Sequence, residues 1–273
     1  KFAPDKVLPR WGAAMALPSL PGTGLARLGA AIGDRTRRRG LGSSLDKLRY
    51  ANAYIYGRAT AQSAERVLYV GVGHGHDAVL ALLEGGARSV VGVDPYWGAH
   101  GNDDLDFDAV GNLISSLSLE TRFVAERMTI QDYLAEHDDT FDLIICNDVL
   151  HHIFVTTDAL SRSAELDAAV ELFAGLRGLL RRGGKLIVVD VGRFGLRQML
   201  ARMGIGGGNV DYTTKQSWLQ WAGAAARAGW TCTATTNYVP YALRRLEPLL
   251  QGRIGRLLAC DRYFLKLQPT ELV

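Results

Sequence analysis

The sequence predicts an α/β fold in which helices cover both faces of a mostly parallel sheet. Short apolar runs of strand length alternate along the chain with segments of helical periodicity, and the links between them are short. Parallel strands that are buried on both faces have this near-continuous hydrophobic character. The 273 residues, 48% of them hydrophobic and 22% charged, suffice for one large domain or two small ones. That composition excludes a disordered chain and a membrane protein with many spans.

Seven segments are expected to be strands, because each is a short apolar run bounded by glycine, proline or polar residues. In chain order they are residues 66–71, 89–94, 122–125, 141–147, 185–190, 231–238 and 262–267. The first strand runs into a cluster of glycines, and the second ends in a carboxylate followed by a proline. Both features are typical of strands whose carboxyl ends border a ligand site.

Helices are expected where apolar residues recur at a spacing of three and four. They cover residues 45–64 (as one helix or two short ones), 77–84, 108–117, 166–180 and 217–228. Glycine pairs mark the ends of two of them, Gly85 with Gly86 and Gly183 with Gly184, since glycine readily adopts the left-handed conformation that ends many helices.

The chain is divided into an N-terminal extension or helical cap over residues 1–60 and a main domain over residues 61–273. Three insertions in the main domain are expected to form one side of a site, at about residues 95–107, 196–216 and 241–258. The apolar stretch 11–32 is interrupted by prolines and glycines, so it is expected to pack on the body and not to span a membrane or act as a signal peptide.

Charge and cysteine content exclude further classes of protein. With 31 basic and 28 acidic residues, the net charge of +3 is too balanced for an obligate nucleic-acid binder. The densest basic run, 35–39, is expected to be a solvated loop. The three cysteines are scattered, which excludes a disulfide framework and a zinc ribbon and favours a reducing, cytoplasmic setting.

The glycine loop has the spacing G-x-G-x-G, with Gly71, Gly73 and Gly75 between a strand and a helix. A dinucleotide site needs a third glycine where this chain has His76, which argues against a pyrophosphate at that helix end. Asp94 ends the second strand, where a carboxylate can accept hydrogen bonds from ribose hydroxyls. A ribose-bearing cofactor without a pyrophosphate is therefore expected.

Four segments carry a resemblance to a known family: residues 67–75, 90–94, 141–153 and 180–190. In order and spacing they resemble the motifs of class I S-adenosylmethionine-dependent methyltransferases over roughly residues 60–195, and the stretch 217–267 fits that family's last helix and antiparallel strand pair. The resemblance implies a three-layer Rossmann-like fold with a seven-stranded sheet whose last strand is antiparallel. It also implies that the main domain is catalytic, with S-adenosylmethionine as cofactor and S-adenosylhomocysteine as product.

The resemblance also implies roles for individual residues. Those on the cofactor side are Gly71, Gly73 and Gly75 at the methionine part with His76 beside them, Asp94 and Pro95 at the ribose, Thr129 and Ile130 at the adenine, and Asn147. Asn147 and Asp148 would line the mouth where the methyl group meets its acceptor. The chain departs from the family pattern at Tyr69, where an acidic residue is usual, and at Thr129, where one is frequent.

Four histidines follow the first and fourth strands and could converge: His74, His76, His151 and His152. Three interpretations stay open, namely a structural imidazole, a general base and a metal site. No tight ligand spacing supports a metal, so none is expected. We predict that His151 or His152, beside Asp148, removes the acceptor's proton.

Aromatic residues of the variable segments favour a small organic acceptor with apolar surface, methylated on oxygen or nitrogen. They are Tyr50, Tyr54, Tyr96, Trp97, Trp218, Trp221, Tyr238 and Tyr241. The cationic and apolar residues of 241–258 leave open a glycan- or lipid-linked acceptor and a peripheral membrane contact, although packing on the sheet edge is favoured. Two alternative functions remain: an inactive cofactor-binding scaffold and, with less support, an RNA methyltransferase. The sequence also leaves open a homodimer. A mobile loop is expected at 204–208.

Overall fold

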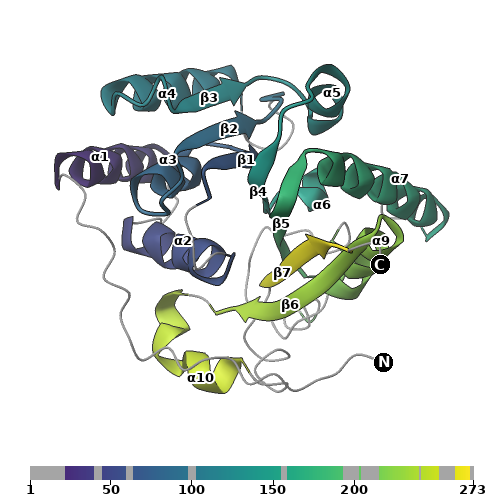
Figure 1. Ribbon diagram of the computed structural model, residues 1–273. Coiled ribbons are helices and arrows are strands. Elements are labelled where there is room, and N and C mark those ends of the chain that lie inside the picture. Colours follow the sequence, from purple (N-terminus) through teal and green to yellow (C-terminus); the bar gives the residue numbers. More distant parts are fainter. Residues whose placement is uncertain are drawn as a thin grey trace.

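A computed structural model of the chain describes residues 22–39, 45–59, 64–97, 103–154, 159–192, 203, 215–239, 241–251 and 262–270. Within these ranges seven strands form one sheet in the order β3-β2-β1-β4-β5-β7-β6 (Figure 1). The strands are β1 (Arg66–Val70), β2 (Ser89–Val93), β3 (Phe123–Glu126), β4 (Phe141–Asn147), β5 (Leu180–Val191), β6 (Trp230–Tyr238) and β7 (Arg262–Pro269). Strands β1 to β5 pair in parallel, whereas β7 runs antiparallel to both β5 and β6. The predicted mostly parallel sheet with an antiparallel last strand is confirmed.

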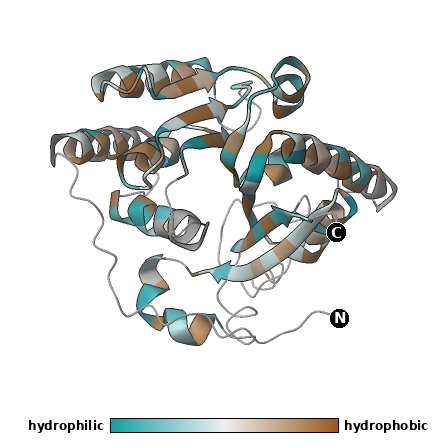
Figure 2. Ribbon diagram, viewed as in Figure 1, coloured by the Kyte–Doolittle hydropathy of each residue, from teal (hydrophilic) through white to brown (hydrophobic). Residues whose placement is uncertain are grey.

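Helices cover both faces of the sheet, as predicted. They are α1 (Gly22–Arg39), α2 (Leu45–Ala59), α3 (His76–Leu83), α4 (Asp104–Ser116), α5 (Ile130–Glu136), α6 (Leu150–Ile153), α7 (Ala159–Gly178), α9 (Trp218–Arg227) and α10 (Glu247–Leu250), with the 3₁₀ helix η1 at Tyr241–Leu246. One core cluster joins α1, α3 and α4 to one face, and a second joins α5, α6, α7 and α9 to the other. In Figure 2, each helix in colour carries both hydrophobic and hydrophilic residues, as expected of helices with one face on a sheet.

Alternation along the strands produces the two core clusters. In β1, Val67 and Tyr69 enter the first cluster, while Leu68 and Val70 enter the second. Successive side chains of a strand point to opposite faces, so an apolar run with no polar gap supplies both cores. The carboxyl ends of the parallel strands β1, β2 and β4 consequently meet at one edge of the sheet, where the glycine loop lies.

Several predicted boundaries are wrong. The basic run 35–39 belongs to the end of α1 and is not a loop, and α4 begins within the predicted insertion 95–107 because Asp103 and Asp106 form a capping box. Helix α7 ends at Gly178, and Gly183 and Gly184, expected to end it, lie within β5.

The N-terminal apolar stretch is described only from Gly22, and there Leu28 and Ile32 of α1 are buried in the first core cluster. Among the described residues, no helix combines the length and apolar character needed to cross a membrane. The expected loop at 204–208 lies outside the described residues.

Candidate active site

The glycine loop joins β1 to α3 through three left-handed residues. Gly71, Gly73 and Gly75 have φ angles of 76°, 54° and 72°, which side chains disfavour. The Gly71 N–H donates to the carbonyl oxygen of Val93 at 2.9 Å and so ties the loop to β2. A Cβ at Gly71 would lie 2.6 Å from Cγ2 of Val149, so the close approach of these two segments needs glycine.

Asp94 holds the loop from the end of β2. Its Oδ2 accepts the Gly73 N–H at 2.9 Å, and its Oδ1 accepts the Tyr96 N–H at 3.1 Å. The Tyr96 hydroxyl donates in return to the carbonyl oxygen of Gly73 at 2.7 Å. Both carboxylate oxygens of the buried Asp94 therefore accept backbone N–H groups, which fixes the carboxylate beside the glycine loop at the end of β2.

A cavity of about 830 Å³ opens beside this loop, a size within the range of small-molecule sites. Residues from the ends of β1, β2, β3 and β4 line it: Val70, Gly71, Val72, Gly73, His74, Asp77, Val93, Asp94, Pro95, Tyr96, Trp97, Thr129, Ile130, Gln131, Asp132, Asn147, Asp148, Val149, His152, Ile153 and Arg262. Among the residues predicted for the cofactor, only Gly75 and His76 are absent from this lining.

Thr129 has a structural task as well as a place in the cavity wall. It is the N-cap of α5, where its Oγ1 accepts the Asp132 N–H at 3.0 Å and donates to Asp132 Oδ2 at 2.6 Å. Asp132 therefore supplies a carboxylate in the region where the sequence has no acidic residue at position 129.

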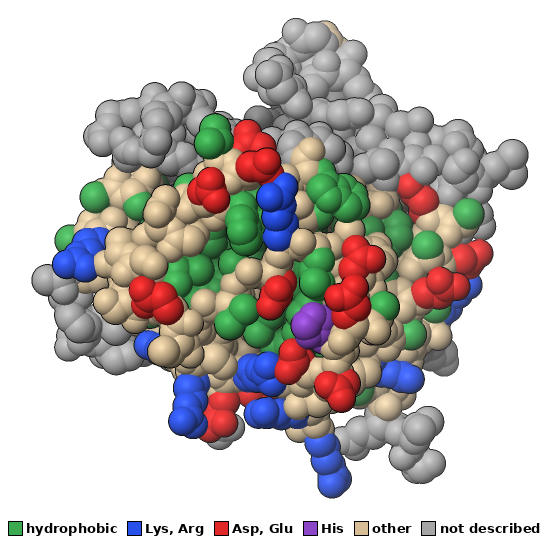
Figure 3. Space-filling view, turned by 90° about the horizontal axis from the view of Figure 1, so that it is seen from above, with side chains coloured by type: hydrophobic (Ala, Val, Ile, Leu, Met, Phe, Trp, Pro, Cys, Tyr) green, Lys and Arg blue, Asp and Glu red, His purple; other side chains and the backbone are tan. Residues whose placement is uncertain are grey.

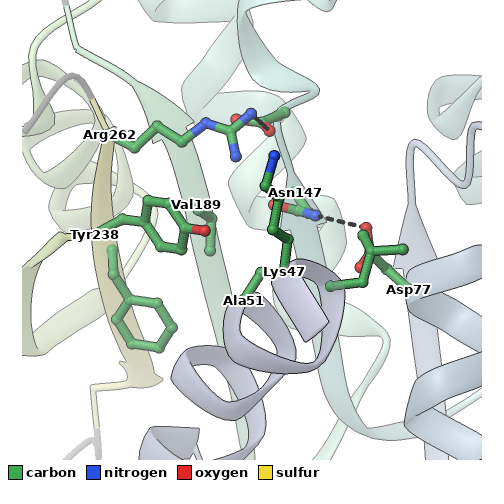
Figure 4. Close-up of a pocket in the computed structure, with 10 residues that line it drawn as sticks. Lys47, Ala51, Asp77, Asn147, Val189, Tyr238 and Arg262 are labelled. Carbon is green, nitrogen blue, oxygen red and sulfur yellow. Dashed lines mark hydrogen bonds and ion pairs between the residues drawn. The ribbon is translucent and has the colours of Figure 1, made fainter. Parts of the chain in front are cut away.

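A second cavity, of about 280 Å³, adjoins the first (Figure 4). Four residues line both cavities: Asp77, Asn147, Asp148 and Arg262. The rest of the smaller cavity consists of Lys47, Leu48, Ala51, Val189, Tyr238 and Phe264. In Figure 4, Arg262 and Tyr238 point into it from one side and Asp77 from the other, with Lys47 rising between them from α2.

Asp77 lies at this junction in the first turn of α3. Its Oδ1 accepts a hydrogen bond from Asn52 Nδ2 at 2.7 Å, and its Oδ2 accepts a weaker one from Asn147 Nδ2 at 3.4 Å. Burial raises the pKa of Asp77 to about 6, and the nearby Asp148 carboxylate adds to the rise, while Asn52 and Arg262 oppose it. Asp77 is therefore a carboxylate that titrates close to neutrality.

Asp148 follows β4 in a left-handed conformation, with φ 52°, and forms an ion pair with Arg262. Burial raises the pKa of Asp148, whereas the Arg262 guanidinium lowers it. Its Oδ1 is buried and has no hydrogen-bond partner among the described residues. Arg262 comes from the first position of β7, where it pairs with Val191 and Tyr238.

The four histidines form two pairs of neighbouring rings. The rings of His74 and His76 are 6.2 Å apart, and those of His151 and His152 are 4.1 Å apart. His74 also contacts Asp106 at 3.1 Å. His74 and His152 line the larger cavity, whereas His76 and His151 line neither cavity. Within the described part of the chain, no three His, Cys, Asp or Glu side chains gather as metal ligands.

The predicted acceptor aromatics divide into three groups. Tyr238 lines the smaller cavity, and Tyr50 lies 6.1 Å from it and 5.6 Å from Tyr241 between ring centroids. Tyr96 and Trp97 line the larger cavity. Trp221 is 1% exposed and belongs to the second core cluster, and the partly buried Trp218 packs against that cluster, so both lie on the core side of α9. The side chain of Tyr54 lies outside the described part.

Sequence reasoning assigned no role to Asn52, Lys47 or Arg262. Asn52 and Lys47 come from α2, and Arg262 lies more than a hundred residues beyond the glycine loop. None of them stands in a motif, so their place at the junction follows only from the packing of α2 and from the register of β7.

A family model described as a methyltransferase domain matches residues 34–235 of the chain. No curated protein matches it significantly. The cyclopropane synthase MmaA2 from Mycobacterium tuberculosis superposes with a TM-score of 0.56 at 13% identity, covering 88% of this chain and 93% of that one.

Two further solved structures share the fold. The geranyl diphosphate C-methyltransferase from Streptomyces coelicolor A3(2), in complex with Mg²⁺, geranyl diphosphate and S-adenosyl-L-homocysteine, has a TM-score of 0.53 at 15% identity, with 83% of this chain and 81% of that one covered. The mitomycin 7-O-methyltransferase MmcR has a TM-score of 0.53 at 13% identity over 91% of this chain. This chain spans 61% of the length of MmcR. At these identities the likeness shows the fold alone.

Proposed function

This chain belongs to the class I S-adenosylmethionine-dependent methyltransferases, and we propose that it methylates an oxygen or nitrogen atom of a small organic acceptor. The observation that carries the proposal is the junction of the two cavities at Asp77, Asn147, Asp148 and Arg262. The larger cavity has the size for the cofactor, and the smaller one has room for the reacting part of an acceptor. Transfer in line needs the two ligands to meet at one point, which such a junction provides.

The larger cavity fits the cofactor in two respects. Gly71 and Gly73 line the cavity with backbone and no side chain, and the buried Asp94 carboxylate lies in the same wall, at the end of β2, where ribose hydroxyls can donate to it. We assign Thr129 and Ile130 to the adenine end and Gly71 and Gly73 to the methionine end. When bound, S-adenosylmethionine supplies a methyl group on a sulfonium sulfur, which is a good leaving group.

We assign the role of general base to Asp77. With a pKa of about 6 it is ionised at neutral pH, yet it is basic enough to take the proton that a hydroxyl or amine loses on methylation. Asn52 and Asn147 orient the carboxylate by donating to its two oxygens. The Arg262 guanidinium fixes the Asp148 carboxylate by an ion pair, and Asp148 forms part of the wall where the two cavities meet. His152 faces the larger cavity and remains the second candidate for the base.

Charge supports a small acceptor over RNA. On the face shown in Figure 3, acidic and basic side chains are interspersed, and the described residues form no continuous basic area there. RNA binding relies on clustered cations that displace counterions from phosphates. A salt-sensitive affinity for RNA would contradict this part of the proposal.

Replacing Asp94 with asparagine should weaken S-adenosylhomocysteine binding by about ten- to a hundredfold, because charge-assisted hydrogen bonds are worth roughly 1.5–3 kcal/mol. Isothermal titration calorimetry measures the affinity. Asp108→Asn makes the same chemical change at an exposed site on α4 and should leave the affinity unaltered. Equal affinities for wild type and Asp94→Asn would remove Asp94 from the cofactor site.

Replacing Asp77 with asparagine should stabilise the protein and abolish turnover. The pKa of Asp77 is about 6 in the folded state and near 3.8 when unperturbed, so the folded state binds more protons between these values. Wild-type stability therefore falls as pH rises from about 4 to about 6, and Asp77→Asn should gain about 3 kcal/mol above pH 7. The gain should vanish below about pH 4, as thermal unfolding across this pH range would reveal.

The same variant tests the reaction. S-adenosylhomocysteine release from S-adenosylmethionine is measured over a panel of small amines, phenols and alcohols. We expect at least one compound to give turnover, with a rate that rises through about pH 6, and Asp77→Asn to lose it while still binding S-adenosylhomocysteine. Binding without turnover on any compound would favour the inactive scaffold, and full turnover by Asp77→Asn would transfer the role of base to His152.

A further inference from the structure

The short helices η1 and α10 expose a row of leucines. Leu243, Leu246 and Leu249 are 37%, 47% and 75% exposed. Residues three apart lie on one face of a 3₁₀ helix, so Leu243 and Leu246 share a face of η1, and Leu249 continues the spacing into α10. Single exposed leucines are ordinary on a protein surface, but several on one face form an apolar patch of the kind that contacts a protein partner or a membrane.

Cations accompany the leucines. Arg244 and Arg245 stand between Leu243 and Leu246, and both are exposed. The sequence from 241 to 258 holds four arginines and one acidic residue, Glu247. Leucines that enter the acyl boundary, beside arginines that meet phosphate headgroups, are the complement of an anionic lipid surface. The core of a protein interface is instead depleted of charge.

The leucine row stands on a fixed support. Gln251 Nε2 donates to the carbonyl oxygen of Asn237 at 3.0 Å, and Asn237 Nδ2 donates to that of Leu250 at 3.4 Å. These bonds tie α10 to strand β6. Figure 1 shows η1 and α10 at the rim of the molecule, below α2 and away from the helices that cover the sheet.

This rim adjoins the smaller cavity through a row of tyrosines. Tyr241 begins η1, Tyr50 of α2 lies 5.6 Å from it, and Tyr238 lies 6.1 Å beyond Tyr50 and lines the cavity. A surface that binds these leucines would therefore lie close to the opening of the smaller cavity.

We propose that η1 and α10 dock the protein on an anionic membrane surface. Docking goes beyond the proposed methyl transfer and does not depend on it. An amphiphilic acceptor in that membrane would reach the smaller cavity past the tyrosines, and only this step rests on the proposed function.

Sedimentation of the full chain with vesicles tests the docking. Wild type should bind vesicles that contain phosphatidylglycerol, bind pure phosphatidylcholine far less, and lose most binding at about 0.5 M NaCl, where the Debye length is short. Leu249→Asp should weaken binding about tenfold or more. Leu105→Asp is the matched control, because Leu105 on α4 is 74% exposed, and it should bind as wild type does.

Arg245→Glu should weaken binding by about tenfold, and Arg182→Glu, at an exposed position of β5, should not. S-adenosylhomocysteine affinity, measured without vesicles, should be the same for all these variants, which separates docking from the cofactor site. The docking is overturned if wild type ignores phosphatidylglycerol, or if Leu105→Asp is as harmful as Leu249→Asp. It is overturned as well if Leu249→Asp dissociates a dimer in vesicle-free buffer, which would assign the leucines to a second copy.

Discussion

Replacing Asp190 with alanine should lower the free energy of unfolding by about 3–5 kcal/mol, because it removes one partner of a buried polar pair. Asp190 is 0% exposed at the end of β5. It accepts the backbone N–H of Val191 at 2.7 Å and that of His151 at 3.2 Å, and its Oδ1 also contacts the His151 ring at Nδ1. Alanine would leave these buried donors without an acceptor. Urea unfolding at neutral pH measures the loss.

A double-mutant cycle identifies what His151 does. If Asp190 and His151 stabilise the fold as a pair, His151→Ala and Asp190→Ala together should cost about 1.5–3 kcal/mol less than the sum of the single losses. If the losses in unfolding free energy add, and His151→Ala alone has little effect, the His151 ring does not stabilise the fold through Asp190. That outcome would return His151 to the role of base, which its 5% exposure and its absence from both cavity walls argue against.

The parts of the site that were predicted are those encoded by local spacing. Gly71, Gly73 and Asp94 stand at fixed distances from strands whose apolar character is clear, so their place at the carboxyl edge follows from the order of elements. The fold class follows in the same way, since alternating strands and helices leave few ways to bury both faces of a sheet.

The parts that were not predicted depend on contacts between distant segments. Asn52 meets Asp77 because α2 packs against α3, and Arg262 meets Asp148 because the register of β7 places it opposite Val191. Neither contact leaves a periodic signal. The pKa of Asp77 depends on this burial, so the residue now proposed as base carried no mark in the sequence beyond its place near the histidines.

Helix ends were misplaced where glycine has more than one use. Gly183 has a φ of 80° and lies in β5, close to the register shift between Phe141 and Leu143 of β4. A glycine pair after an amphipathic segment favours a helix end, but the same freedom serves an irregular strand. Gly183 and Gly184 belong to a strand and not to a helix end because β5, which contains them, pairs with β4.

Gly71→Ala should lower the free energy of unfolding by about 3 kcal/mol and weaken S-adenosylhomocysteine binding. A left-handed conformation costs alanine about 1–2 kcal/mol, and overlap with a neighbour adds about 1–3 kcal/mol. The new Cβ would lie 2.6 Å and 2.7 Å from Cγ2 and Cβ of Val149, which lines the larger cavity. Relief of this overlap displaces either the loop or Val149, and both belong to the cavity wall. Thermal unfolding and calorimetric titration measure the two effects.

Two variants separate overlap from backbone strain. Gly111→Ala adds the same methyl group to α4, where nothing lies within 4 Å of the new atom, and should stabilise the protein by up to about 1 kcal/mol. Val149→Ala combined with Gly71→Ala should recover part of the loss, because it removes Cγ2 but leaves φ at 76°. If the double variant recovers nothing, the loss comes from backbone strain together with the contact to the Val149 Cβ, which alanine retains at 2.7 Å. A different outcome is that the double variant regains stability but still binds S-adenosylhomocysteine weakly. That result would show that the cofactor is received by the left-handed turn itself, and not by the space beside Val149.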